Sequence, residues 1–360
     1  MAIAPSPTDK MADTASPPDY SPQANNFNFM RLCLAVLVIL SHSFEIIDGN
    51  RHREPLTRIF HTLSFGEVAV DAFFLLSGYL IVKSWDQRPV LLSYVKKRVY
   101  RIYPGFIAAS LICAFVVGPL ASNASLYFSH FNLKHFVGSV VLLDAPAIPS
   151  VFSGLHYPVV NGSMWTIYYE FRCYVAVALI GLTGMVKKKW PWLLITILAL
   201  AASLLPTPSI NRIAFHARMF IIGSPDEFFR LFALFCAGGV FYLYRDKINY
   251  RPSLMLVALL ATVAGMFNVH TAQFVLATCG AYVFFGIGFK HIQGLEWHRS
   301  WPDISYGVYL YGWPCTILIF WYYRSIDPYL LFPCALLLTS CLGWLSWRWV
   351  ESPFMKRKPI

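Results

Sequence analysis

The chain has 360 residues, of which 57% are hydrophobic, 17% aromatic and only 13% charged, and its mean hydropathy is +0.54. A soluble globular protein carries roughly twice this fraction of charged residues, so the composition excludes an ordinary soluble domain. Apolar stretches of about 17–22 residues alternate with short polar links along the chain. This pattern predicts an all-α polytopic membrane protein that lies in the lipid bilayer.

The formal net charge of +11 would also suit a nucleic-acid-binding protein. However, Lys and Arg gather in alternate links between the apolar stretches, which is the pattern of cytoplasmic sidedness in membrane proteins. We therefore expect no nucleic-acid partner. The eight cysteines lie mostly within apolar runs and lack paired CxxC spacing. They are interpreted as small core residues, and no metal site is expected.

The first 26 residues are rich in Pro, Ser, Ala and Asp and contain no apolar run. We predict a disordered cytoplasmic tail at 1–26, one membrane domain at 27–355 and a basic cytoplasmic tail at 356–360. The positive-inside bias places both termini in the cytoplasm, in agreement with an even number of spans. About ten transmembrane helices are predicted, at 29–47, 66–84, 104–121, 164–184, 190–206, 228–244, 254–269, 272–290, 304–323 and 329–350.

Two of the predicted links differ from the others. Residues 85–103 mix basic and apolar residues at helical spacing, which predicts an interfacial helix on the cytoplasmic side. Residues 122–162 form the longest link and are predicted to face outside. Long ordered loops are more often functional than idle.

The first predicted span contains Arg31 and His42, with ten residues between them. Eleven steps of about 100° place both on one helix face, about 16 Å apart along the axis. Arg31 alone is also explained as an interfacial anchor, and His42 alone as a packing residue. A single polar stripe explains both residues together, and such stripes mark functional pathways in membranes. A neutral imidazole there can take a proton from a hydroxyl group.

The second predicted span contains Asp71, which needs a partner inside a membrane. In the same span, Ser77 and Gly78 are small residues that allow another helix to approach closely. Ordinary helix packing explains Gly78 but leaves the charge of Asp71 unexplained.

Arg98 and Arg101 are three residues apart and so share one helix face close to the membrane. Guanidinium groups bind phosphates in a bidentate manner, although on charge alone attraction to anionic lipid headgroups is the simpler explanation. Glu170 lies in an otherwise apolar, aromatic helix, where it could orient a His or an Arg or accept a sugar hydroxyl. An ion pair with Arg172 is disfavoured because residues i and i+2 point apart on a helix.

Six motifs, taken together and in this order, resemble the acyltransferase-3 family of polytopic membrane acyltransferases, which modify bacterial surface glycans. The resemblance extends from about residue 25 to residue 355. The motifs are Arg31-x10-His42, FFLLSGYLI at 73–81, RVYRIYP at 98–104, Trp165 to Glu170 with Tyr174, SYGVYLY at 305–311, and the terminal VESPF.

The resemblance implies a membrane O-acyltransferase that uses cytoplasmic acyl-CoA, usually acetyl-CoA. The acyl group would pass to a hydroxyl of an extracytoplasmic or lipid-linked carbohydrate, such as an exopolysaccharide, O-antigen or capsule. The family's essential Arg and His correspond to Arg31 and His42, its paired arginines to Arg98 and Arg101, and its glutamate to Glu170. The supporting polar residues are expected to be Asp71, Ser77 and Trp165.

The sequence departs from the family pattern at several places. Gly312 stands where several branches have His, Ala69 replaces a frequent Gly, and Arg172 replaces an aromatic or apolar residue. No hydrolase-like domain follows the last predicted span, which is typical of the stand-alone form. The acyl group would then pass directly to the acceptor or to a glycan-assembly partner protein. The implied location is the inner membrane of a bacterium.

A transporter or flippase for a saccharide or lipid-linked saccharide is the alternative, with the polar stripe as its permeation path. Such proteins often contain inverted repeats, and none is visible here. A purely structural membrane scaffold would not need His42, Asp71 and Glu170 within the bilayer. The sequence leaves open which carbohydrate accepts the acyl group and whether that group is acetyl, succinyl or longer.

Overall fold

The computed structural model describes residues 25–205, 223–292, 294–295 and 301–356, and all regular secondary structure in these ranges is helical. The predicted tails before residue 25 and after residue 356 lie outside the described residues. The principal helices are α1 (Phe27–Asp48), α3 (Phe65–Gln87), α4 (Leu91–Ile112), α8 (Trp165–Leu182), α9 (Lys189–Ser203), α11 (Pro225–Tyr244), α12 (Pro252–Gly265), α13 (Val269–Val275), α14 (Ala281–Phe289), α15 (Ser305–Tyr322) and α16 (Pro328–Ser346).

The described part of the chain is an integral membrane protein, because six of its helices are long and apolar enough to cross a bilayer. They are Phe27–Asp48, Phe65–Gln87, Leu91–Leu120, Pro225–Lys247, Val269–Phe289 and Pro328–Met355. Two shorter apolar helices, α9 and α12, fall on predicted spans, as do α8 and α15. The all-helical prediction is confirmed for these residues, whereas the count of ten spans and the cytoplasmic termini remain predictions.

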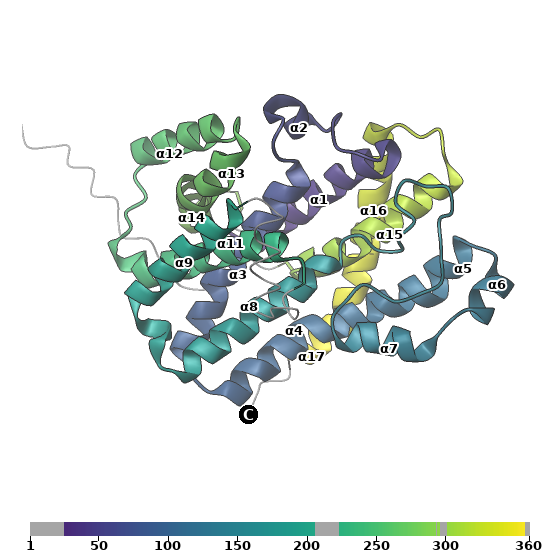
Figure 1. Ribbon diagram of the computed structural model, residues 1–360, viewed down its shortest axis with the longest axis horizontal. Coiled ribbons are helices and arrows are strands. Elements are labelled where there is room, and N and C mark those ends of the chain that lie inside the picture. Colours follow the sequence, from purple (N-terminus) through teal and green to yellow (C-terminus); the bar gives the residue numbers. More distant parts are fainter. Residues whose placement is uncertain (1–24, 206–222, 293, 296–300, 357–360) are drawn as a thin grey trace, which may run out of the picture.

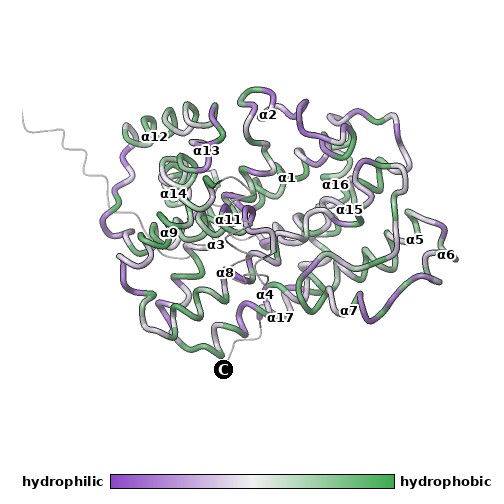
Figure 2. Tube along the Cα trace, in the orientation of Figure 1, coloured by the Kyte–Doolittle hydropathy of each residue, from purple (hydrophilic) through white to green (hydrophobic). Residues whose placement is uncertain are grey.

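Helix α1 lies in the middle of the bundle and packs against α3, α15 and α16 (Figure 1). Helix α3 in turn contacts α8 and α11. The short helices α6 (Ala124–Ser129) and α7 (Leu133–Val141) lie at one end of the molecule, and α12 and α14 lie at the other (Figure 1). Hydrophilic residues gather in connections such as the one that carries α2 (Pro55–Phe60), as Figure 2 shows. On α1 itself, the polar residues Ser41, His42, Ser43 and Glu45 are buried.

The predicted interfacial helix at 85–103 is helical from residue 91 but is not a separate element, and its position at the interface stays a prediction. Helix α4 begins at Leu91 and continues through a π-helical turn at Cys113–Val117 to Leu120. Pro104 lies inside this helix without ending it, which membrane helices tolerate when neighbours satisfy the freed backbone groups. The basic residues of this segment therefore occupy the first turns of a long apolar helix.

Two glycines hold α3 and α11 at short distance. A Cβ on Gly78 would lie 1.8 Å from the carbonyl oxygen of Phe235, and one on Gly238 would lie 1.9 Å from that of Leu75. No side chain fits in such a gap, so the backbones themselves are in contact. The prediction that Gly78 allows close helix approach is confirmed.

Gly78→Ala should therefore force α3 and α11 apart and lower the free energy of unfolding by at least about 1–3 kcal/mol, the usual effect of overpacking. Thermal melting of the purified protein in detergent measures the effect. Gly138→Ala is the matched control, because a Cβ there meets no atom within 4 Å. Equal melting temperatures for the two variants would contradict the close contact.

Candidate active site

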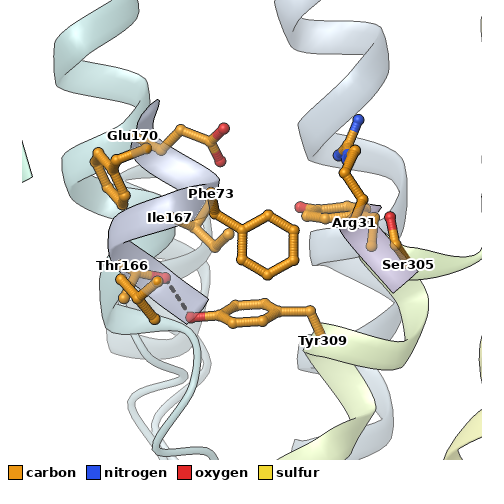
Figure 3. Close-up of a pocket in the computed structure, with 10 residues that line it drawn as sticks. Arg31, Phe73, Thr166, Ile167, Glu170, Ser305 and Tyr309 are labelled. Carbon is orange, nitrogen blue, oxygen red and sulfur yellow. Dashed lines mark hydrogen bonds between the residues drawn. The ribbon is translucent and has the colours of Figure 1, made fainter. Parts of the chain in front are cut away.

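Three cavities follow one another along α1, and neighbouring cavities share lining residues. The arginine cavity, of about 70 Å³, is lined by Arg98 and Arg101 among others. The middle cavity, of about 40 Å³, shares Arg31 and Glu170 with it. Figure 3 shows Arg31 and Glu170 on opposite sides of the middle cavity, with Phe73 between them.

The third, histidine cavity is the largest, at about 240 Å³, and His42 lines it. It shares Val70 and Tyr309 with the middle cavity. The hydroxyl of Tyr309 lies 2.5 Å from that of Thr166, the contact marked in Figure 3. Arg31 and His42 thus line successive cavities on one face of α1, as their helical spacing predicts.

In the arginine cavity, two arginines share one carboxylate. Arg101 Nη2 donates to Asp303 Oδ2 over 2.8 Å, and Arg31 Nη1 lies 3.3 Å from the same oxygen. Burial raises the pKa of Asp303, which directly precedes α15, but the two guanidinium groups outweigh burial and hold that pKa below its ordinary value. Sequence reasoning missed Asp303, although an acid at the start of a predicted span was a possible partner for Arg31.

Arg98 is the less engaged of the paired arginines. Its guanidinium lies 5.8 Å from the ring centre of Tyr94 and 5.7 Å from that of Tyr174. Nη2 makes a long contact of 3.4 Å to Ser84 Oγ. Its buried Nε has no hydrogen-bond partner among the described residues. Arg98 can therefore accept an anion without first giving up an ion pair.

Glu170 belongs to the arginine and middle cavities. Its Oε1 accepts hydrogen bonds from Ser77 Oγ over 2.9 Å and from the hydroxyl of Tyr174 over 2.5 Å. Ser77 and Glu170 are thus brought together, but Glu170 does not line the histidine cavity. Of the roles that the sequence leaves open to Glu170, this placement therefore does not support the orientation of His42.

The acid beside His42 is Glu45, one turn further along α1. Glu45 Oε2 lies 3.2 Å from His42 Nδ1, and Ser163 Oγ lies 3.2 Å from Nε2. The edge of Trp313 packs against the imidazole, with ring centres 4.8 Å apart. Sequence reasoning missed Glu45, although its spacing of three residues from His42 places both on one face.

Arg51, in the link after α1, holds Glu45 in place. Arg51 Nη2 donates to both carboxylate oxygens of Glu45 over 3.0 Å, and Nη1 lies 3.5 Å from Glu67. A carboxylate fixed in this way accepts the Nδ1 proton of a neutral imidazole and leaves Nε2 of His42 as the basic nitrogen. The geometry therefore places the imidazole between a carboxylate and a hydroxyl, an arrangement that can act as a general base.

Ser163 is presented by a polar turn just before α8. Asn161 Oδ1 accepts the backbone N–H of Ser163 over 3.0 Å, and Asn161 Nδ2 donates to the carbonyl of Leu310 over 2.9 Å. The hydroxyl of Tyr309 donates to the carbonyl of Ser163 over 2.9 Å. Trp165, the first residue of α8, lines the same cavity. Leu310 and Tyr309 of α15 thus hold the turn, one at Asn161 and the other at Ser163.

Asp71 has the partner that its position requires, which confirms that prediction. Its carboxylate is ion-paired with Arg230 of α11, and Arg230 Nη2 also lies 2.9 Å from Glu227. Arg230 and Glu227 line the histidine cavity, whereas Asp71 stands behind them. Asp71 therefore supports the cavity wall instead of reaching into the cavity.

Asp71→Asn should destabilise the protein strongly, because removing one partner of a buried ion pair costs about 3–5 kcal/mol. Replacing both partners, in Asp71→Leu with Arg230→Met, should recover most of that loss, since no charge is then left without its partner. Thermal melting of both variants in detergent measures this. A double variant less stable than Asp71→Asn would contradict the structural role of the pair.

Comparisons with known proteins bear on what this arrangement does. A family model for the acyltransferase domain matches residues 25–348. An O-acetyl transferase of Shigella phage Sf6 is 28% identical over 93% of this chain and 97% of its own length. Nodulation protein 10 of Rhizobium leguminosarum bv. viciae is 26% identical over 92% of this chain and 93% of its own length. No solved structure matches.

The family match includes every helix that lines the three cavities, from α1 to α15. It favours an enzyme over the transporter that the polar stripe alone leaves open. Because the family model matches most of this chain, the chain belongs to the acyltransferase-3 family.

Proposed function

We propose that the protein is a membrane O-acetyltransferase that moves an acetyl group from acetyl-CoA to a hydroxyl of a carbohydrate. The observation that carries the proposal is the His42–Glu45 pair, which faces a cavity of about 240 Å³ connected through shared lining residues to an arginine-lined cavity. Family membership and the similarity to a phage O-acetyl transferase support the reaction type.

In this proposal ten helices cross the inner membrane of a bacterium and both termini are cytoplasmic. The positive-inside distribution of Lys and Arg supports that orientation. Both Arg98 and Arg101 lie near the end where α1 begins, which becomes the cytoplasmic end, and His42 lies toward the opposite side. Donor and acceptor then approach from opposite faces of the membrane.

The CoA phosphates would bind at the arginine cavity. Arg98 is the first candidate, because its Nε is buried without a partner among the described residues. Arg31 and Arg101 already share Asp303, and a phosphate group of the donor would compete with that carboxylate. Glu170 forms a polar wall along the route from this cavity to the next.

At the other end, His42 would act as the general base and Glu45 would orient it. The histidine cavity also presents the rings of Trp165 and Trp313 and charged groups of both signs, including Arg51 and Glu67. Flat aromatic faces pack against sugar rings, and charged groups exchange hydrogen bonds with sugar hydroxyls. This lining suits a polyhydroxylated acceptor such as a surface polysaccharide or its lipid-linked precursor.

His42→Ala should lower the rate of acetyl transfer by about 10²–10⁴-fold without preventing insertion or folding, because it removes the base. Glu45→Gln should also lower kcat, since an amide can stabilise the wrong imidazole tautomer. The assay follows radiolabel from acetyl-CoA into the carbohydrate fraction of membranes from expressing cells. His52→Ala is the control, because His52 is exposed in the following link. Full activity of His42→Ala would refute the assignment.

Arg98→Gln should raise the KM for acetyl-CoA about tenfold or more, because a hydrogen bond to a charged group is worth about 1.5–3 kcal/mol. The same variant should use acetyl-pantetheine, which lacks the nucleotide phosphates, as well as the unchanged protein does. Steady-state kinetics with both donors measures the difference. Arg88→Gln, an exposed site, provides the matched control. Equal loss with both donors would exclude phosphate recognition by Arg98.

A further inference from the structure

Ser163 stands in front of the basic nitrogen of the site. Its Oγ lies 3.2 Å from His42 Nε2, while Glu45 Oε2 lies 3.2 Å from Nδ1 on the other side of the ring. Ser163 is 1% exposed and its side chain lines the histidine cavity. The order of groups is therefore hydroxyl, imidazole, carboxylate, the arrangement that activates a serine nucleophile.

We propose that Ser163 is the nucleophile that first receives the acyl group, so that transfer proceeds through a covalent acyl-serine. This inference rests on the proposed acyltransferase function and adds an intermediate to it. In a direct transfer, the acceptor hydroxyl would have to displace Ser163 Oγ from His42 Nε2 before reaction. With Ser163 as nucleophile, the hydroxyl already in place is the one that reacts.

Backbone and side-chain contacts fix the position of the serine. Asn161 and Tyr309 hold the backbone N–H and carbonyl of Ser163, so the side chain is presented from a rigid turn. Helix α8 begins two residues later, at Trp165, and no side chain caps its N-terminus among the described residues. The positive end of the α8 helix dipole is therefore close in sequence to Ser163, and a positive dipole end favours negative charge that develops nearby.

The first half-reaction balances with the groups present. Ser163 Oγ attacks the thioester carbonyl carbon, the Oγ–C bond forms and the C–S bond breaks. The serine proton passes to His42 Nε2 and then to the departing sulfur, which leaves as the CoA thiol. In the second half-reaction an acceptor hydroxyl attacks the acyl carbon and the C–Oγ bond breaks. Its proton passes through His42 to Ser163 Oγ, which restores the enzyme.

The sizes of the cavities agree with this sequence of steps. The middle cavity has about 40 Å³, whereas the histidine cavity has about 240 Å³. The smaller middle cavity suits an extended pantetheine arm better than a sugar ring, and the wider histidine cavity suits a sugar. Once the acyl group is on Ser163, the CoA thiol can withdraw before the acceptor occupies the histidine cavity. Donor and acceptor need not meet there at the same time.

Isotope exchange in the absence of any acceptor tests the proposal. The purified full-length protein in nanodiscs is incubated with acetyl-CoA and radiolabelled CoA, and the label entering acetyl-CoA is measured. An acyl-serine requires exchange, which direct transfer cannot give. The peptide that contains Ser163 should carry an acetyl group by mass spectrometry. Ser163→Ala should lose exchange to background, at least about 10²-fold.

The matched control is Ser43→Ala, because Ser43 is also buried on α1 but bonds the backbone carbonyl of Ile39 and lines none of the three cavities. It should keep wild-type exchange. Ser163→Cys retains a nucleophile and should be trapped as an acetyl-thioester, which excludes misfolding as the cause of loss in Ser163→Ala. Thermal melting checks the fold of all three variants.

Two results would overturn the proposal while leaving the O-acetyltransferase function intact. One is transfer to carbohydrate by the unchanged protein without exchange and without an acetylated Ser163 peptide. The other is carbohydrate acetylation by Ser163→Ala at close to the wild-type rate. Exchange that depends on Ser163 in a protein that acetylates no carbohydrate would support the acyl-serine and reject only the proposed acceptor.

Discussion

Charged groups inside a bilayer must be compensated, and this constraint accounts for most of the contacts that define the site. Three groups of buried or partly buried ionic contacts provide this compensation: Arg31 and Arg101 with Asp303, Asp71 with Arg230, and the His42–Glu45–Arg51 chain. The first two connect segments that are far apart in the sequence. Helices α1, α3, α4, α11 and α15 are therefore linked through charges as well as through apolar packing.

Because α1 supplies a residue to each of the three cavities, it can position two different chemical tasks at a fixed separation. In the proposed function, an anionic donor enters at the cavities that Arg31 lines, and a hydroxyl reacts at the cavity that His42 lines. Because α1 packs on α3, α15 and α16, it holds Arg31 and His42 at a fixed separation. Preorganised positions of this kind are what acyl transfer requires, since a misplaced base loses most of its effect.

The sequence predicts the local features of this site well. Helical spacing correctly places Arg31 and His42 on one face, the isolated charge of Asp71 implies a partner, and Gly78 marks a close helix contact. These inferences depend only on helix geometry and on the energetics of charge in a membrane. The same reasoning carries no information on which distant residue meets which, so Arg230 as the partner could not be named.

Tertiary packing decides what helical spacing leaves open. The sequence allows Glu170 to orient either a His or an Arg, and the fold places Glu170 beside Ser77 and brings Glu45 to His42. Asp303 and Ser163 lie in connections between helices, where no periodicity marks them. The basic residues of 85–103 predict a separate helix, whereas in the structure the helix continues into the apolar run that follows. Which residues meet, and where such a helix begins, depends on tertiary packing that the sequence pattern does not contain.

The central claim is that one continuous route joins the arginine cavity to the histidine cavity across the membrane. The most direct test uses proteoliposomes in which all molecules have one orientation, with acetyl-CoA supplied on the face of Arg98 and carbohydrate acceptor only on the opposite face. The account predicts acetylated carbohydrate on the acceptor side while acetyl-CoA stays on its own side. Transfer that occurs only when donor and acceptor share the same face would contradict it.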